Sequence, residues 1–213
     1  MAIDLTPQRA LIFRITHRDN VPWIIQNGLH CRNSGVIDPN FVPIGNPELI
    51  ERRRTQLVPV LPGGLLSDYV PFYFTPFSMM MYQIKTGFNG IRQRENEEIA
   101  IVVSSLHKLR ERGVQYLFSD RHASLSSAEF TSDLDDLGKL DWPSWRNRDF
   151  KIDPEHPDKK ERYQAEALAY QHVPVDALLG IVCYNDIATS SMKERLGNVG
   201  ENVKVVTKRG WYF

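Results

Sequence analysis

Cysteine is scarce in this sequence, and neither sign of charge is in excess. The 213 residues include two cysteines, Cys31 and Cys183, which form no CxxC pair. This usage argues against a zinc site and against a disulfide framework, so we expect no metal and two free thiols in a reducing cytoplasm. Lysine plus arginine and aspartate plus glutamate number 26 each. Any contact with nucleic acid would therefore need a local basic patch rather than a global positive field.

Long apolar runs and a glycine-rich phosphate motif are also missing. No run approaches the roughly 20 apolar residues that a helix needs to cross a bilayer. Residues 1–7 lack a basic segment followed by an apolar one, so we expect a cytoplasmic protein with no secretory signal and no membrane contact. No Gly-x-Gly-x-x-Gly occurs, which argues against a Rossmann dinucleotide site.

The composition is that of a folded globular chain, with 42% hydrophobic and 24% charged residues. This length allows one domain or at most two small ones. Apolar runs alternate with segments that carry helix caps and stops, which indicates a mixed α/β or α+β fold. The expected strands are 10–16, 69–75, 99–104, 114–118, 178–184, 202–207 and 210–213, and the expected helices are 21–27, 47–56, 77–84, 105–113, 125–137 and 185–196.

A carboxylate interrupts the alternating apolar segment 162–170. Glu166, Leu168 and Tyr170 share one parity, and the alanines between them share the other, which is the period of a strand. A carboxylate on a half-buried strand is costly unless it is paired or used in chemistry. The alternative is a surface glutamate at a strand start, and spacing alone favours that simpler interpretation.

Three consecutive arginines, Arg52 to Arg54, end the expected helix that Asn46 caps and Pro47 begins. They form either a solvated basic helix end or a site for phosphate or pyrophosphate. Because three adjacent residues cover most of a helix circumference, at least one can point inward.

The segment 119–162 interleaves aromatic and basic side chains. Such residues on a loop suit stacking on unpaired bases, with cations on the phosphates. The alternative, held equally, is that the tryptophans fold back on the core. The candidates for contact with such an unpaired strand are His122, Trp142, Trp145, Arg146, Arg148, Lys151, Lys159 and Arg162.

Three separated pieces of sequence now align with a known pattern. They are Thr16 and His17 with 24–29, then 73–75 with Ser78 and Tyr82, and finally 166–170. In this order they resemble the His–Tyr–Glu signature of ADP-ribosyltransferases of the diphtheria-toxin and poly-ADP-ribose-polymerase type.

A closer resemblance, running from about residue 11 to the end, is to the DarT family of DNA-targeting ADP-ribosyltransferase toxins. It rests on residues 44–46 with 51–53, 68–74 with 78–82, 119–123, 164–166 and 211–213. It implies a single α+β domain over 1–213 with the ADP-ribosyltransferase fold. That fold has two packed, mainly antiparallel sheets, flanking helices and a long substrate-recognition loop at about 119–162. It also implies single-stranded DNA as acceptor, a macrodomain antitoxin of the DarG type as partner, and a monomer.

The resemblance also implies roles for residues. Glu166 and Arg53 would be catalytic. NAD⁺, the co-substrate, would be held by His17, Arg14, Gly28, Leu29, Tyr73, Ser78, Tyr82 and Arg52. In this interpretation Tyr73 and Tyr82 stack on nicotinamide, while His17 holds the adenosine-side ribose.

The chemistry would be transfer of ADP-ribose from NAD⁺ to a base of single-stranded DNA, with thymine as the expected base. A carboxylate stabilises the positive charge that develops on the ribose as nicotinamide leaves, and it can take a proton from the attacking base nitrogen. A base nitrogen used in pairing is out of reach in a duplex. Two alternatives are a transferase of the same fold acting on RNA or protein, and a non-catalytic single-strand-binding module.

Overall fold

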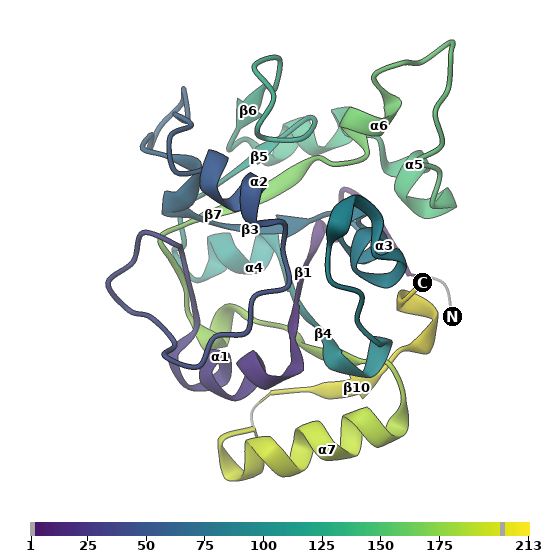
Figure 1. Ribbon diagram of the computed structural model, residues 1–213. Helices are drawn as coiled ribbons and strands as arrows, with labels where there is room; N and C mark the ends of the chain where they lie inside the picture. Colours follow the sequence, from purple (N-terminus) through teal and green to yellow (C-terminus); the bar gives the residue numbers. More distant parts are fainter. Residues whose placement is uncertain (1–2, 201–202) are drawn as a thin grey trace.

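The computed structural model describes residues 3–200 and 203–213 (Figure 1). These residues form an eight-stranded sheet in the order β10-β9-β4-β1-β3-β7-β5-β6 and a two-stranded ribbon of β2 and β8. The large sheet consists of β1 (Leu11–His17), β3 (Tyr69–Tyr73), β4 (Ile99–Ser105), β5 (Tyr116–Ser119), β6 (Phe130–Thr131), β7 (Glu166–Tyr170), β9 (Gly180–Cys183) and β10 (Val205–Thr207). The ribbon pairs β2 (Leu29–His30) with β8 (His172–Val173).

The large sheet has two halves that meet at β1 and β3. Strand β1 pairs with β4 along its whole length, whereas it pairs with β3 at a single position, Phe13 opposite Tyr73. On the other side of this joint, β3 pairs with β7 from Tyr69 opposite Tyr170 to Tyr73 opposite Glu166. Figure 1 shows β3 and β7 running across the upper part of the molecule while β1 and β4 descend below them. The two expected sheets are thus two four-stranded halves joined in the middle.

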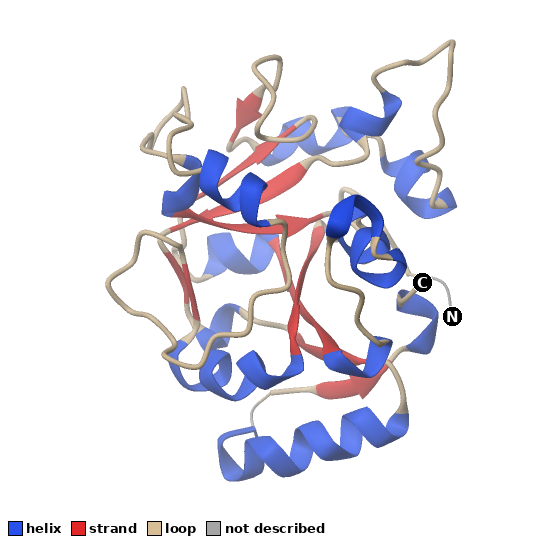
Figure 2. Cartoon of the chain, viewed as in Figure 1, coloured by secondary structure: helices blue, strands red, loops and turns tan. Residues whose placement is uncertain are grey.

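Helices surround the sheet halves (Figure 2). They are α1 (Val21–Asn27), α2 (Pro47–Arg52), α3 (Met79–Thr86), α4 (Leu106–Glu111), α5 (Trp142–Asn147), α6 (Lys159–Arg162) and α7 (Asp186–Leu196). Their ends follow local chemistry. Asn46 caps α2 by accepting from the Glu48 and Leu49 amides, and the Ser78 hydroxyl caps α3 by accepting from the Met81 amide.

Two expected elements are wrong. The helix expected at 125–137 is replaced by β6 and a 3-10 helix, Leu134–Lys139. Here aspartate side chains accept hydrogen bonds from backbone amides: Asp120 accepts from the Glu129 amide, and Asp133 accepts from the Asp135 amide. Such local hydrogen bonds compete with the hydrogen bonds of a helix. The strand expected at 210–213 is replaced by the end of a 3-10 helix, Arg209–Trp211, and by two residues without regular structure. Strand β10 lies within the strand expected at 202–207, of which Asn202 falls outside the described residues.

Candidate active site

Glu166 is the first residue of β7 and lies opposite Tyr73 on β3. It is 3% exposed, so the surface alternative is wrong. Its carboxylate is held at both oxygens. Oε2 accepts from Arg53 Nη1 at 2.8 Å, and Oε1 accepts from the Ala123 amide at 3.2 Å. The Glu166 amide donates to the Ser119 hydroxyl. We call Glu166, Arg53, His122 and Ala123 the Glu166 cluster.

Arg53 is the inward-pointing member of the arginine run. It follows the last turn of α2, and its carbonyl accepts from both the amide and the hydroxyl of Ser67. Its side chain is 14% exposed, whereas Arg52 and Arg54 are exposed and Arg54 pairs with Glu51. The Arg53 Nη2 atom is buried and has no hydrogen-bond partner within 3–200 and 203–213. A donor of this kind beside a carboxylate can bind a substrate oxygen.

Tyr73 and Arg14 complete the polar surroundings of Glu166. Burial, reinforced by the charge of Glu166, raises the pKa of Tyr73, so the phenol stays neutral. Arg14 donates to the Pro71 carbonyl at 2.9 Å. Burial lowers the pKa of Arg14 to about 10, with Tyr73 opposing and Arg53 adding to the effect, which leaves Arg14 cationic at neutral pH. Two cations therefore lie near the tyrosine and the glutamate.

His122 flanks the carboxylate from the substrate loop. Its Nδ1 atom lies 3.9 Å from Glu166 Oε1 and accepts from the Ser124 amide at 3.1 Å. Because Nδ1 accepts, it carries no proton and makes no hydrogen bond to Glu166. The His122 amide donates to the Glu161 carbonyl, which ties this end of the loop to α6.

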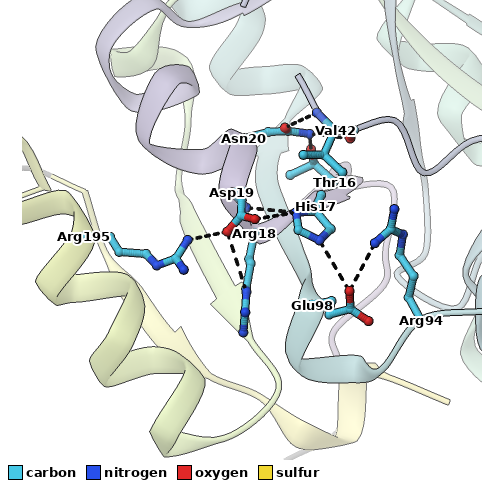
Figure 3. Close-up of polar contacts among 9 residues, drawn as sticks. All are labelled: Thr16, His17, Arg18, Asp19, Asn20, Val42, Arg94, Glu98 and Arg195. Carbon is cyan, nitrogen blue, oxygen red and sulfur yellow. Dashed lines mark hydrogen bonds and ion pairs between the residues drawn. The ribbon is translucent and has the colours of Figure 1, made fainter. Parts of the chain in front are cut away.

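His17 lies in a separate group of charges (Figure 3). Its Nδ1 atom accepts from the Asp19 amide at 3.2 Å, and its Nε2 atom lies 3.6 Å from Glu98 Oε1. Asp19 pairs with Arg195 of α7, and Glu98 pairs with Arg94 at 3.1 Å. Burial and the charge of Arg94 outweigh the two carboxylates and lower the pKa of His17. We call His17, Arg18, Asp19, Arg94, Glu98 and Arg195 the His17 cluster.

The remaining residues expected to bind NAD⁺ have clear structural surroundings. Gly28 has φ 81, and a Cβ there would lie 2.4 Å from His172 Nε2, so the β2–β8 ribbon itself requires this glycine. Leu29 is buried in β2, and Ser78 caps α3. The Tyr82 ring packs against Phe150 and Phe213. The cofactor roles of His17, Gly28, Leu29, Ser78 and Tyr82 stay predictions.

The expectation that Trp142 and Trp145 stack on DNA bases is wrong. The residues are 3% and 1% exposed. Their rings pack against each other and against Phe74, and their indole N–H groups donate to the Leu137 and Tyr163 carbonyls. Rings covered in this way belong to the core, so the alternative of tryptophans folding back is the one that the structure adopts.

The cationic residues of the loop differ in the partners that their side chains bind. Arg146 and Arg148 are exposed but donate to the Leu5 and Gly210 carbonyls, and Arg162 pairs with Asp158 and Asp141. Lys159 pairs with Asp149 and Asp153. Lys151 is exposed. Their contacts with DNA stay predictions.

Comparisons with known proteins decide the family. The family model described as "ssDNA thymidine ADP-ribosyltransferase, DarT" matches residues 13–213. The chain belongs to the DarT family. It is 49% identical to a DNA ADP-ribosyl transferase of Escherichia coli O127:H6 (strain E2348/69 / EPEC) over 209 residues, covering 98% of this chain and 96% of the relative.

Solved DarT structures have the same fold. Thermus sp. 2.9 DarT in complex with ADP-ribosylated ssDNA matches with a TM-score of 0.85 and 32% identity, covering 97% of this chain and 98% of that one. The same Thermus protein in complex with NAD⁺ matches with a TM-score of 0.80 and 30% identity over the whole of both chains. This DarT-family chain is a DNA ADP-ribosyltransferase that uses NAD⁺ as its co-substrate.

The described part of this DarT-family chain has no helix long and apolar enough to cross a membrane. Within the same residues no group of three or more His, Cys, Asp or Glu side chains could hold a metal ion.

Sequence reasoning missed the residues of this DarT-family chain that position Glu166 and Arg53 through backbone amides and hydroxyl groups. The Ala123 amide reaches Glu166 directly, and the Ser119 hydroxyl accepts from the Glu166 amide. Ser67 fixes Arg53 through its carbonyl. A backbone amide leaves no residue-type signal. Ser119 and Ala123 do lie within the motif 119–123, which marked the place but not the contact.

Proposed function

We propose that this chain transfers the ADP-ribosyl group of NAD⁺ to N3 of thymidine in single-stranded DNA, with Glu166 as the catalytic carboxylate and Arg53 as its catalytic partner. The observation that carries the assignment is the buried Glu166–Arg53 pair beside Tyr73 at the β3–β7 register. Thymine N1 carries the deoxyribose, so N3 is the remaining ring nitrogen.

Glu166 has two tasks in the transfer. It stabilises the positive charge that develops on the ribose, and it takes the N3 proton. A bond forms between thymine N3 and C1′ of the nicotinamide-side ribose of NAD⁺. The bond between this C1′ and nicotinamide breaks at the same time, and its electron pair leaves with nicotinamide. Arg53 keeps Glu166 oriented through Nη1 and presents Nη2 to the substrate.

The co-substrate side comprises Tyr73 and Tyr82 for nicotinamide, Arg14 and Arg52 for the pyrophosphate, and His17, Gly28, Leu29 and Ser78 for the remainder. The acceptor side comprises His122 next to Glu166, with Arg146, Arg148, Lys151 and Arg162 for DNA phosphates. The protein acts as a cytoplasmic monomer, and its partner is a macrodomain antitoxin of the DarG type.

Mass spectrometry of oligonucleotides tests the function. Single strands with one thymidine, or with none, and a duplex are incubated with NAD⁺. We expect one ADP-ribose on the thymidine-containing single strand and none on the others. The absence of this increment, while calorimetry detects NAD⁺ binding, would contradict the proposal. RNA and protein acceptors in parallel reactions test a transferase of different specificity, and DNA binding that is indifferent to NAD⁺ would identify a non-catalytic module.

A further inference from the structure

Three buried polar atoms near Glu166 lack a hydrogen-bond partner within residues 3–200 and 203–213. They are Arg53 Nη2, Gln56 Oε1 and Ser124 Oγ. An unpaired buried polar group costs about 1–3 kcal/mol, and such groups are few in native structures. Three of them near one carboxylate indicate that a ligand pairs with them in the working enzyme.

Hydrogen bonds connect the residues that carry these atoms to Glu166. Gln56 Nε2 donates to the Ala123 carbonyl at 3.4 Å, and that carbonyl belongs to the peptide that joins Ala123 to Ser124. The Ala123 amide donates to Glu166 Oε1, while Arg53 binds Oε2. Gln56 and Ser124 are therefore connected through Ala123 to Oε1 of the carboxylate, and Arg53 binds Oε2.

The backbone of each residue is anchored. The Leu66 amide donates to the Gln56 carbonyl at 2.9 Å, and Ser67 holds the Arg53 carbonyl. The Ser124 amide donates to His122 Nδ1 at 3.1 Å. Polar groups on fixed backbone are prepared for one binding geometry, which favours selectivity.

The chemical types of the three atoms form a pattern. Arg53 Nη2 donates, and Gln56 must accept through Oε1, because its Nε2 faces a carbonyl. The Ser124 hydroxyl can donate. Thymine presents a carbonyl, N3–H and a second carbonyl along its Watson–Crick edge, which is acceptor, donor, acceptor. Two donors and one acceptor complement that edge, whereas cytosine presents two acceptors and an amino donor.

We propose that Gln56 and Ser124, together with Arg53, form the subsite that reads the Watson–Crick edge of the acceptor base. This inference rests on the proposed function. Arg53 and Ser124 bind the two carbonyl oxygens, and Gln56 Oε1 accepts N3–H as the base enters. A neutral amide cannot take the proton, so the base reorients and its N3–H leaves Gln56 and meets Glu166 for the transfer. The proton passes to Glu166, and a bond forms between N3 and C1′ of the nicotinamide-side ribose. Nicotinamide leaves with the electron pair of its bond to that C1′.

Steady-state kinetics on short single strands with one thymidine, deoxyuridine or deoxycytidine tests the subsite. Gln56→Met keeps the side-chain length without polar atoms, and Ser124→Ala removes the hydroxyl. We expect each to lower kcat/KM for thymidine about 10-fold to 100-fold and to shrink the preference for thymidine over deoxycytidine. The dissociation constant of NAD⁺ should change less than twofold. Ser124→Thr should restore most of the activity.

Matched controls separate the subsite from general effects. Gln8→Met and Ser126→Ala change exposed residues and should leave both kinetics and melting temperature unchanged. In the wild type, deoxyuridine should react within about fivefold of thymidine, since both carry the same edge, and N3-methylthymidine should not react.

The outcomes distinguish this inference from the proposed function. If the wild type modifies no thymidine, the proposed function fails. If the wild type is active but Gln56→Met and Ser124→Ala keep their thymidine preference, the subsite assignment is overturned. An equal loss on every base, with unchanged selectivity, overturns it as well, because a merely structural role for Gln56 in holding Ala123 predicts that result. Rejection of deoxyuridine would show that the thymine methyl is read instead.

Discussion

The Glu166 cluster and the His17 cluster each contain an ion pair between a carboxylate and an arginine, and the Glu166–Arg53 pair differs in burial from the Asp19–Arg195 pair. The side chains of Glu166 and Arg53 are 4% and 14% exposed, whereas those of Asp19 and Arg195 are 44% and 39% exposed. An exposed ion pair contributes about 0–1 kcal/mol, while breaking a buried one costs about 3–5 kcal/mol. Breaking the Glu166–Arg53 pair should therefore cost more free energy of unfolding than breaking the Asp19–Arg195 pair.

The two clusters also differ in what their members connect. Asp19 and Arg195 join the end of β1 to α7, and His17 and Glu98 join neighbouring strand ends. These contacts fix elements to one another. Glu166 is held by Arg53 and by the substrate loop, and Arg53 Nη2 has no hydrogen-bond partner in the described part of the chain. We conclude that the contacts of the His17 cluster hold parts of the scaffold together, whereas those of the Glu166 cluster position one carboxylate for reaction.

The largest effect should come from Glu166→Gln. The amide still hydrogen-bonds to Arg53 but carries no charge, so kcat should fall about 10²-fold to 10³-fold while the chain stays folded. ADP-ribose transfer measured by oligonucleotide mass, with circular dichroism as the folding check, tests this. The control is Glu161→Gln on α6, which should keep full activity. Unchanged DNA labelling by Glu166→Gln would remove Glu166 from the catalytic role.

Arg53→Ala should combine a stability effect with a loss of activity. It leaves the buried Glu166 carboxylate without its cation, and we expect the free energy of unfolding to fall by about 3 kcal/mol. Urea denaturation measures this value. Arg54→Ala removes an exposed arginine of the same run and should cost less than about 0.5 kcal/mol. Equal effects of the two substitutions would contradict the distinction drawn within the arginine run.

His17→Gln tests the scaffold and the co-substrate site together. Because both ring nitrogens of His17 already face Asp19 and Glu98, we expect a loss of about 1–2 kcal/mol in stability. Because the proposed function places His17 at NAD⁺, we also expect a raised KM for NAD⁺. Thermal melting and steady-state kinetics measure the two quantities. A lowered melting temperature with an unchanged KM for NAD⁺ would remove His17 from the co-substrate site.

Acid should weaken the His17 cluster first. Burial lowers the pKa of His17 below its ordinary value of 6.5, so the unfolded chain binds protons more readily. The contribution of His17 is complete above about pH 6.5 and falls as pH drops through its folded pKa.

Protonation of Asp19 and Glu98 should lower the stability of the folded chain further, at a lower pH than protonation of His17. Burial alone would raise the pKa of Asp19, but the hydrogen bond from Arg195 and the nearby cations lower it. The hydrogen bond from the Glu95 amide and the charge of Arg94 lower that of Glu98 against burial. Their contribution is lost as pH falls below their ordinary values of 3.8 and 4.5. Melting temperatures from pH 7.5 to 5.5 should decline more for the wild type than for His17→Gln, and parallel declines would exclude His17 as the titrating group.

The sequence correctly predicted the strands and helices that local residue patterns determine. The alternation around Glu166 predicted β7, Asn46 and Pro47 predicted the start of α2, and the apolar run 99–104 predicted β4. The residue pattern left the three adjacent arginines equivalent; the family resemblance favoured Arg53, which is the least exposed of the three. The burial of Trp142 and Trp145 was outside its reach, because an aromatic ring on a loop suits a base and a core equally well. The Ala123 amide was outside its reach too, since a backbone donor has the same chemistry at every residue except proline.

The joint at Phe13 and Tyr73 has a consequence for how such a protein can diverge. Because one register position joins the two halves of the sheet, insertions and substitutions in β5, β6 and the loop beyond them leave the pairing of β1 with β4 and of β4 with β9 undisturbed. The half that carries Glu166 can therefore acquire a new acceptor preference through changes in its loops, while the half that carries Arg14 and His17 is inherited intact.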